Sequence, residues 1–333
     1  MKTNTQILID SIPQGALRKE NYRIAEASIP SLKSNEVLLK TVAIAITAGT
    51  RAGLQGSASY AGTPQTGIPM NATGIGRVEA SESEEFRINE LVVAPTGWQL
   101  YSKHATNVVN KIDPLHNPID YLGPLGINGL TAYFGLLEVA KLISHDIVMI
   151  SAAGGSVGHI AGQIAKLKGS RVIGICGDTK KSEKLVSTLN FDAALNYKKD
   201  NYRQTLKEAT PEGVDVYFDN TGGIILGSAL RRLNIGGRIA CCGVVSQYDT
   251  NQPEPGPTGI PGLLVNKRIT MRGFLVFDYT EHYAKARQDI AGWLAQGKLQ
   301  HLTDEVSGLE KAPEAFVDLL AGGNIGTRII KIN

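Results

Sequence analysis

The stretch IVMISAAGGSVGHIAGQIAKLKGSRVIGIC, residues 147–176, places a glycine-rich turn and an amphipathic segment between two short apolar runs. The runs at 147–151 and 171–175 have the length and composition of buried strands. Between them, residues 158–168 carry isoleucine and leucine at helical spacing, which predicts a helix. A strand, a tight turn, a helix and a second strand in this order form the β-α-β unit of a parallel sheet.

The turn inside this unit runs from Ala153 to Gly158 and fits the pattern G-x-G-x-x-G with alanine in the first position. Gly155 would let the backbone approach a pyrophosphate, and Gly158 would let the helix pack closely on the strand. The N-terminus of the helix would then offer N–H groups and a positive dipole to the phosphates. A glycine-rich turn can also serve packing alone, but in this context it predicts dinucleotide binding by Gly155, Ser156, Val157 and Gly158.

The alternation of strands and helices continues beyond this unit. Further strands are expected at residues 214–219, 237–242 and 269–276, and further helices at 130–139, 181–189, 224–233 and 283–295. This rhythm predicts an α/β protein with a Rossmann doubly wound parallel sheet. The chain before about residue 118 is instead β-rich, with strands expected at 37–46, 74–80 and 90–95 and a last strand at 328–332. A loop rich in Gly, Ser, Ala and Thr, residues 53–69, contains Tyr60 and is expected to border a site.

Length and composition exclude several classes of protein. The 333 residues suggest about two domains, and 34 Lys and Arg against 31 Asp and Glu do not favour a nucleic-acid or membrane-surface partner. There is no apolar run of about 18 residues and no signal-peptide pattern at the N-terminus, so we expect a cytoplasmic protein. The three cysteines form no C-x-x-C pair and the six histidines are scattered, so neither a disulfide framework nor a metal site is predicted.

The end of the second strand of the unit bears on the choice between NAD and NADP. NAD sites usually place an acidic residue there to bind the ribose hydroxyls. Asp178 follows Gly177 and could turn towards the ribose, but it equally suits the N-cap of a helix. Lys180, Lys181 and Lys184 come next and could neutralise a 2′-phosphate, or simply face solvent. On balance the sequence predicts NADP.

Several motifs in order resemble the zinc-independent medium-chain dehydrogenase/reductase family. Within that family the likeness is to the branch of prostaglandin reductases (leukotriene B4 12-hydroxydehydrogenases), plant alkenal double-bond reductases and bacterial curcumin reductase. The motifs are GLTAYFGL at 129–136, SAAGGSVG at 151–158, GQIAK at 162–166, FDAALNYK at 191–198, YFDN at 217–220 with GG at 222–223, and GNIG at 323–326. GWQ at 97–99 and residues 74–78 extend the likeness into the N-terminal half.

The resemblance implies two domains, a homodimer and NADPH (NADP) as cofactor. Residues 1–120 and 300–333 would form a β-rich, barrel-like (GroES-like) catalytic domain that binds substrate, and residues 121–299 the NADP-binding Rossmann domain. By position, Lys181 and Tyr197 would hold the 2′-phosphate. The rest of the cofactor would be lined by Asn220, Cys242, Gly243, Val244, Val245, Ser246, Tyr248, Phe274, Leu275, Val276 and Asn324.

The family reaction is reduction of the carbon–carbon double bond of an α,β-unsaturated ketone or aldehyde, with hydride transfer from NADPH to the β-carbon. Negative charge then develops on the carbonyl oxygen as an enolate, which a phenol can stabilise by hydrogen bonding. Tyr248 and Tyr60 are therefore the candidate catalytic residues. Three alternatives stay open: a quinone reductase of the same superfamily, a catalytically weak NADPH-binding homologue, and a zinc alcohol dehydrogenase. The last would need cysteine ligands in the first domain, yet no cysteine precedes Cys176.

Two departures from the family pattern concern the substrate pocket. Residues 47–51 read TAGTR where the family often has D-P-Y-M-R, so a pocket tyrosine is absent. Asn266 stands where plant members have a tyrosine before Lys-Arg. We therefore expect a pocket that is roomier, or different in polarity, and the substrate cannot be taken from any one relative.

Overall fold

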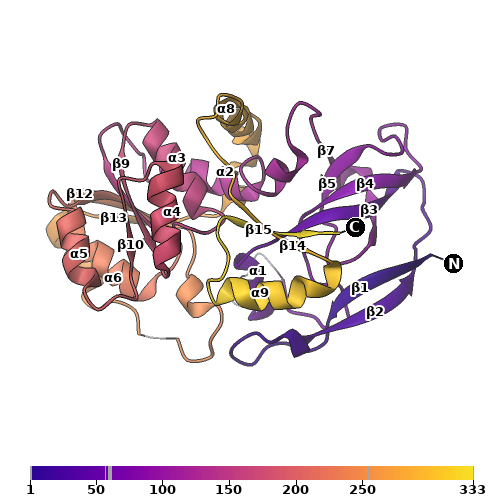
Figure 1. The fold of residues 1–333 in the computed structure, drawn as a ribbon, viewed down its shortest axis with the longest axis horizontal. Helices are drawn as coiled ribbons and strands as arrows, with labels where there is room; N and C mark the ends of the chain where they lie inside the picture. The colour runs from indigo at the N-terminus through magenta and orange to yellow at the C-terminus, as the bar shows by residue number, and fades with distance from the viewer. Residues whose placement is uncertain (1, 57, 59–61, 254, 333) are drawn as a thin grey trace. The chain divides into compact units, whose positions relative to one another are not determined.

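The structure is a computed structural model that describes residues 2–56, 58, 62–253 and 255–332 (Figure 1). The backbone contacts divide the chain into two compact units. Unit 1 comprises Met1–Gly123, Tyr248–Asn251 and Thr303–Asn333, and unit 2 comprises Pro124–Gln247 and Gln252–Leu302. The chain therefore enters unit 1 for four residues in the middle of unit 2, at Tyr248–Asn251.

Unit 2 is built on a six-stranded parallel sheet, which confirms the predicted doubly wound fold. The strands lie in the order β10 (Ala193–Asn196), β9 (Arg171–Cys176), β8 (Ile147–Ser151), β11 (Val214–Asp219), β12 (Leu233–Cys241) and β13 (Thr270–Gly273). All five residues of β8 are buried, as expected of a central strand covered on both faces. The strand order reverses between β8 and β11, and ligands of open α/β sheets bind at such a switch point.

Helices surround this sheet. They are α2 (Ile127–Phe134), continued by the π-helical turn η5 (Gly135–Val139), α3 (Gly158–Leu167), α4 (Thr179–Leu189), α5 (Tyr202–Ala209), α6 (Gly223–Arg232), α7 (Ile260–Lys267) and α8 (Tyr283–Ala295). The expected strand at 269–276 is shorter, because β13 ends at Gly273 and the 3₁₀ segment η7 (Val276–His282) begins three residues later. Phe274 leaves the strand direction and packs edge-on against Phe218 of β11, with ring centroids 6.4 Å apart.

Unit 1 is β-rich, as predicted. A seven-stranded sheet follows the order β14 (Thr303–Ser307), β15 (Thr327–Lys331), β3 (Glu36–Ile46), β4 (Gly74–Ser81), β5 (Leu91–Ala94) and β7 (Asn110–Lys111), with β6 (Tyr101–Ala105) also paired to β3. A separate antiparallel pair joins β1 (Thr3–Ile9) to β2 (Tyr22–Ser28). Among the described residues, the α-helices of this unit are α1 (Gly49–Leu54) and α9 (Ala312–Leu320).

The C-terminal segment completes the sheet of unit 1. In Figure 1 the yellow strand β15 lies beside the indigo strand β3, and the two pair antiparallel from Arg328–Ile46 to Lys331–Ala43. Trp98 is 1% exposed in the core of this unit, between Tyr22 and Phe316. Residues of the C-terminal strand β15 and of the N-terminal strand β1 thus belong to the same hydrophobic core.

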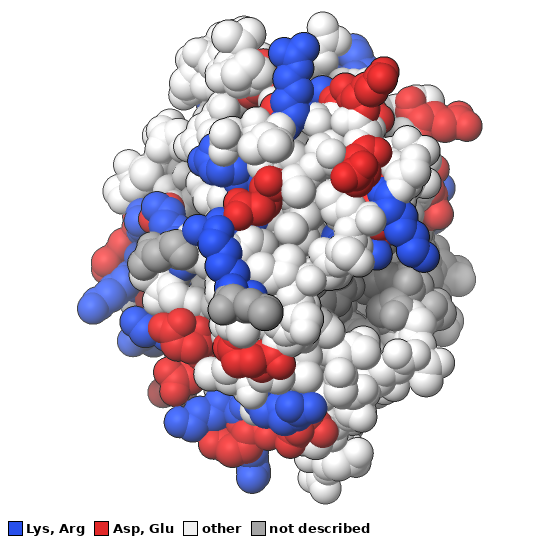
Figure 2. Space-filling view, turned by 90° about the vertical axis from the view of Figure 1, so that its right-hand side faces the viewer, with Lys and Arg blue, Asp and Glu red and all other residues white. Residues whose placement is uncertain are grey.

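Charged side chains of both signs are interspersed on the face shown in Figure 2. In unit 1 the exposed side chains of Arg23 and Asp10 form an ion pair with an N–O distance of 2.9 Å. Across the described residues, no helix combines the length and apolarity that crossing a membrane requires.

Candidate functional site

The glycine-rich turn connects β8 to α3 and brings two backbone segments very close together. A Cβ on Gly158 would lie 2.3 Å from the carbonyl oxygen of Ala152 and 2.7 Å from the Cα of Ala153, so only glycine fits. A Cβ on Gly155 would meet only the Ala152 oxygen, at 3.2 Å. Ala152 itself has a φ of 47°, in the left-handed region, and accepts the Gly155 N–H at 2.9 Å. The turn therefore has the close packing and the open backbone that a pyrophosphate site requires.

The start of α3 supplies the electrostatic part of this site. Val157 is its N-cap residue, and among the described side chains none caps the helix. The first N–H groups of a helix have no partner within the helix, and the positive end of its dipole favours anions. An uncapped N-terminus directly after Gly155 therefore suits a bound phosphate group.

His159 supports the turn from inside the unit. Its side chain is fully buried, its Nδ1 lies 2.8 Å from the carbonyl oxygen of Gly155, and the Leu302 N–H donates to its Nε2 at 3.3 Å. Since a backbone N–H can only donate, Nε2 is the acceptor and Nδ1 carries the proton of a neutral ring. Burial lowers the pKa of His159 from 6.5 to about 3, against the opposing effect of the Gly155 hydrogen bond. Sequence patterns did not single out this histidine, because its role depends on residue 302 folding back to meet it.

A neutral buried His159 gives the chain a defined dependence on pH. Because its pKa is lower in the folded state, the unfolded chain binds one more proton between pH 6.5 and about 3. Stability from this group is complete above pH 6.5 and declines on acidification, by at most about 1.4 kcal/mol per pH unit. His159→Gln keeps a donor and an acceptor but does not titrate, so its free energy of unfolding should fall less between pH 7.5 and 5. Equal slopes for the two proteins in urea titrations would contradict this.

Asp178 is the N-cap of α4. Its φ and ψ are −148° and 140°, and its carboxylate accepts the Lys181 N–H at 3.0 Å. Of the two roles that the sequence left open for Asp178, the structure therefore shows the capping role. The segment between β9 and α4 places no other acidic side chain after the strand.

Basic and phenolic side chains gather beside the glycines that follow β8 and β9. A Cβ on Gly154 would lie 3.3 Å from Cδ of Lys181, which places that side chain against the turn. A Cβ on Gly177 would lie 3.1 Å from both Cε1 of Tyr197 and Cε of Lys198. Tyr197 is 38% exposed, so its ring is accessible. The arrangement suits a phosphate monoester, and Lys198 is a member of it to which sequence reasoning assigned no role, although it adjoins Tyr197 in the same motif.

At the switch point, polar groups tie the ends of β8 and β11 together. The Nδ2 of Asn220 donates to the Ser151 carbonyl at 2.7 Å, and the Asn220 N–H donates to the Ser151 hydroxyl at 2.9 Å. Asp219 is 3% exposed, and its Oδ1 accepts the Tyr217 hydroxyl at 2.8 Å and the N–H groups of Thr221 and Gly222 at 3.0 and 2.8 Å. Hydrogen bonds thus fix the backbone that follows β11 at the switch point, where open α/β sheets generally bind ligands.

Backbone hydrogen bonds continue this arrangement to the segment after β12. The N–H groups of Cys242 and Gly243 donate to the Asp219 carbonyl at 2.8 and 3.1 Å. Val245 and Ser246 donate in the same way to the carbonyls of Asn220 and Thr221, at 3.1 and 3.2 Å. Residues 242–246 therefore run beside residues 219–221.

All the predicted cofactor residues of unit 2 follow the carboxyl ends of its strands. Because the strands are parallel, these ends share one edge of the sheet. The set follows β8 (Gly155, Ser156, Val157, Gly158), β9 (Lys181), β10 (Tyr197), β11 (Asn220), β12 (Cys242, Gly243, Val244, Val245, Ser246) and β13 (Phe274, Leu275, Val276).

The remaining predicted residues lie elsewhere. Tyr248 is half-buried and belongs to unit 1. Asn324 also belongs to unit 1, where its Nδ2 donates to the Gly326 carbonyl at 2.8 Å. Tyr60 falls outside the described residues. Within the described part of the chain, no group of three or more His, Cys, Asp or Glu side chains is placed to hold a metal ion.

Comparisons with known proteins place the chain among oxidoreductases. Residues 156–292 match the family described as zinc-binding dehydrogenase, and residues 5–112 match the N-terminal domain of oxidoreductase. The NADPH-dependent curcumin reductase of Escherichia coli is 33% identical over 99% of this chain and 97% of its own. The NADP(+)-dependent 2-alkenal reductase of Nicotiana tabacum is 35% identical over 99% and 98%. The crystal structure of CurA from Vibrio vulnificus in complex with NADPH has a TM-score of 0.94 and 37% identity over 99% of each chain.

Proposed function

We propose that this chain, which belongs to the medium-chain dehydrogenase/reductase family of NADP-dependent oxidoreductases, reduces the carbon–carbon double bond of α,β-unsaturated ketones and aldehydes. The observation that carries the cofactor is the group of Lys181, Tyr197 and Lys198 at the edge of the sheet, with Asp178 occupied as a helix cap. The substrate class is supported by the names of the relatives, a curcumin reductase and a 2-alkenal reductase.

The residues present fit NADPH. Gly155 and Gly158 leave the backbone open where a side chain would intrude, and the uncapped N-terminus of α3 follows them. These residues, with Ser156 and Val157, would hold the pyrophosphate. Lys181, Tyr197 and Lys198 would hold the 2′-phosphate. Asn220, residues 242–246, residues 274–276 and Asn324 would line the rest.

When bound, NADPH supplies a hydride for the β-carbon of the substrate. The chain itself has to fix the orientation of both molecules and stabilise the negative charge that develops on the carbonyl oxygen of the substrate. Tyr248 is the candidate for this second task among the described residues, because a phenol donates a hydrogen bond without being charged. Tyr60 is a second candidate.

Small residues begin α1 where the family often has an aromatic side chain. β3 ends at Ile46, and Thr47, Ala48 and Gly49 lead into the helix. We take this as support for a wider substrate pocket.

The second departure from the family pattern, Asn266, is exposed in α7. The neighbouring Lys267 donates from Nζ to the carbonyls of Arg231 and Leu233 at 2.9 and 2.7 Å, at the end of α6.

A homodimer and a cytoplasmic location are part of the same proposal. β13 is an end strand of the six-stranded sheet, with Thr270 and Arg272 exposed, so it offers an edge to a second copy. The three cysteines are unpaired, as in proteins of reducing compartments.

The reaction is tested with NADPH that carries deuterium at C4 of the nicotinamide. With an enone as substrate, the saturated ketone should carry the deuterium on the former β-carbon, as seen by NMR. Deuterium on the carbonyl carbon would show alcohol dehydrogenase chemistry instead and would overturn the proposal. NADPH oxidation with quinones but with no enone would move the chain to quinone reduction.

Lys181→Ala tests the choice of cofactor. We expect the Kd for NADPH to rise about 5- to 150-fold, the effect of losing about 1–3 kcal/mol from a hydrogen bond to a charged group. Affinity for NADH should not change, because NADH has no 2′-phosphate. The Asp178 cap uses the backbone N–H of Lys181 and survives the substitution.

Calorimetry provides the measurement, and Lys184→Ala on the same helix is the matched control, since Lys184 is exposed. A Kd for NADPH within twofold of the wild-type value in Lys181→Ala would remove Lys181 from the site.

A further inference from the structure

Arg51 lies in α1, and its guanidinium joins distant parts of unit 1. Its Nε donates to Oδ1 of Asp249 at 3.0 Å, and its Nη2 donates to the Gly15 carbonyl. The Arg51 side chain is 0% exposed and that of Asp249 is 28% exposed. A buried charge is tolerated only when it is paired, so Arg51 and Asp249 depend on each other.

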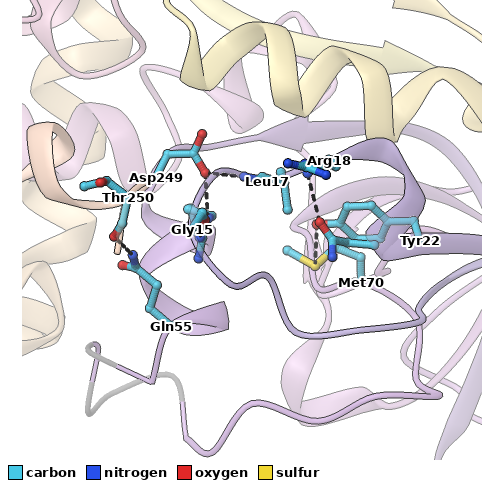
Figure 3. Close-up of polar contacts among 10 residues, drawn as sticks. Gly15, Leu17, Arg18, Tyr22, Gln55, Met70, Asp249 and Thr250 are labelled. Atoms are coloured by element: carbon cyan, nitrogen blue, oxygen red, sulfur yellow. Dashed lines mark hydrogen bonds and ion pairs between the residues drawn. The ribbon is translucent and has the colours of Figure 1, made fainter. Parts of the chain in front are cut away.

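Further contacts hold the residues around Asp249. The Leu17 N–H donates to the same Asp249 Oδ1 at 2.6 Å, and Nε2 of Gln55 donates to the Thr250 carbonyl at 3.3 Å. A Cβ on Gly15 would lie 3.6 Å from the side-chain amide of Asn251. Figure 3 shows Asp249 directed towards Leu17 and the loop at Gly15, with Thr250 beside Gln55. Asp249 and Thr250 are therefore held by hydrogen bonds from α1, from its C-cap residue Gln55 and from the loop at 15–17.

These contacts explain why Tyr248–Asn251 belongs to unit 1 although the chain on both sides belongs to unit 2. Tyr248 is the first residue of the segment 248–251 and directly precedes Asp249, whose carboxylate pairs with Arg51. Its backbone is therefore fixed by a pair whose arginine is 198 positions away from Asp249 in the sequence.

We propose that Arg51 and Asp249 are positioning residues that fasten Tyr248 to the unit formed by the N- and C-terminal segments. The inference rests on the proposed function, in which Tyr248 stabilises the developing enolate. The phenol is then carried by unit 1, whereas the pyrophosphate turn and Lys181 belong to unit 2. Loss of the pair leaves the cofactor residues of unit 2 in place and takes the phenol out of its productive position.

An arginine paired with an aspartate is suited to positioning Tyr248. The planar guanidinium bonds the carboxylate from Nε and the carbonyl from Nη2, and a lysine ammonium cannot reproduce these two separate donor positions from its single nitrogen. Nη1 of Arg51 is buried and has no partner among the described residues, so the group is not fully satisfied. A buried ion pair contributes little net stability compared with an apolar pair of similar shape, because desolvation offsets the attraction. Stability alone therefore does not account for this pair.

The test is a double-mutant cycle between Asp249→Ala and Tyr248→Phe, with an enone and NADPH. Misplacing a catalytic group by about 1 Å costs up to about a hundredfold in rate, so Asp249→Ala should lower kcat about ten- to a hundredfold. Its Kd for NADPH should stay within twofold of the wild-type value. In the double variant kcat should equal that of the lower single variant. Once Asp249→Ala has displaced the phenol, removing its hydroxyl has no further effect on the rate.

Independent losses that multiply in the double variant would overturn the proposal, as would a wild-type kcat in Asp249→Ala. Arg51→Lys is the second variant, and it should lower kcat in the same way if it folds. The control is Asp10→Ala, which removes the exposed ion pair with Arg23 from the same unit and should leave kcat unchanged.

Hydrogen exchange separates this inference from the proposed function, because it needs no turnover. Asp249→Ala removes the acceptor of the Leu17 N–H, so exchange in peptides covering residues 12–17 and 245–252 should accelerate. Unchanged exchange there overturns the inference whatever the activity. Faster exchange with wild-type kcat also overturns it, while the proposed function stands. A wild-type chain that reduces no enone defeats the proposed function and with it the role of the pair in turnover.

Discussion

Replacing Gly158 with alanine should raise the Kd for NADPH about a hundredfold or more. The added Cβ would lie 2.3 Å from the Ala152 oxygen and 2.7 Å from the Ala153 Cα, and both of these are backbone atoms that cannot rotate away. Either the turn or the first residues of α3 must therefore move, and the N–H groups that would face the pyrophosphate move with them. Two hydrogen bonds to a charged group, at about 1.5–3 kcal/mol each, correspond to more than a hundredfold in affinity.

Calorimetric titration with NADPH measures this effect, and circular dichroism with thermal melting checks that the variant is folded. Gly262→Ala is the matched control, because a Cβ there meets no atom within 4 Å. It should bind NADPH with the wild-type Kd. A folded Gly158→Ala protein that binds NADPH within about fivefold of the wild-type chain would contradict a pyrophosphate site at this turn.

Tyr248→Phe should lower kcat for an enone about a hundredfold and change KM far less. Removing one hydrogen-bond donor from a developing oxyanion costs about 10²–10³ in kcat, because the bond strengthens as charge accumulates. The ground-state substrate carries little charge on that oxygen, so binding changes less. Phenylalanine keeps the ring of this half-buried side chain, and thermal melting checks that the variant is folded.

Steady-state kinetics on one enone with saturating NADPH provides the measurement. Tyr121→Phe is the control, since its hydroxyl accepts the Asp113 N–H in unit 1 and has no part in the proposed reaction. A wild-type kcat in Tyr248→Phe would reject enolate stabilisation by this residue and leave the task to another group, Tyr60 being the next to test.

The fold could be predicted in large part because its signals are local. Short apolar runs such as 147–151 and 214–219, each followed by glycines, predict buried parallel strands directly. Details that depend on distant contacts could not be predicted. The π-helical turn at Gly135 is one example, since a Cβ there would lie 2.5 Å from the Phe218 ring and 2.7 Å from Phe274. Phe274 packs against the same Phe218 ring directly after β13 ends at Gly273, short of the predicted end of this strand at Val276.

In the candidate site, too, the residues with local sequence signals could be predicted, and those that depend on distant contacts could not. Gly155 and Gly158 stand within one β-α-β unit, so spacing alone indicates them, whereas Lys181 follows that unit in a cluster of lysines and takes its role from the family resemblance. Whether Asp178 faced a ribose or capped a helix was decided only by the backbone geometry, with its carboxylate on the Lys181 N–H. The pair of Arg51 and Asp249 spans 198 positions and has no sequence pattern. Contacts of this kind arise from tertiary packing and become visible only in the structure.

The rate of NADPH oxidation with an enone, compared with a quinone and with NADH in place of NADPH, tests the proposed function most directly. The enone should be turned over rapidly with NADPH, at least about tenfold more slowly with subsaturating NADH, and at an unchanged rate in the presence of a metal chelator. Turnover of the quinone alone would contradict enone reduction, and equal rates with NADH would contradict a 2′-phosphate site at Lys181, Tyr197 and Lys198.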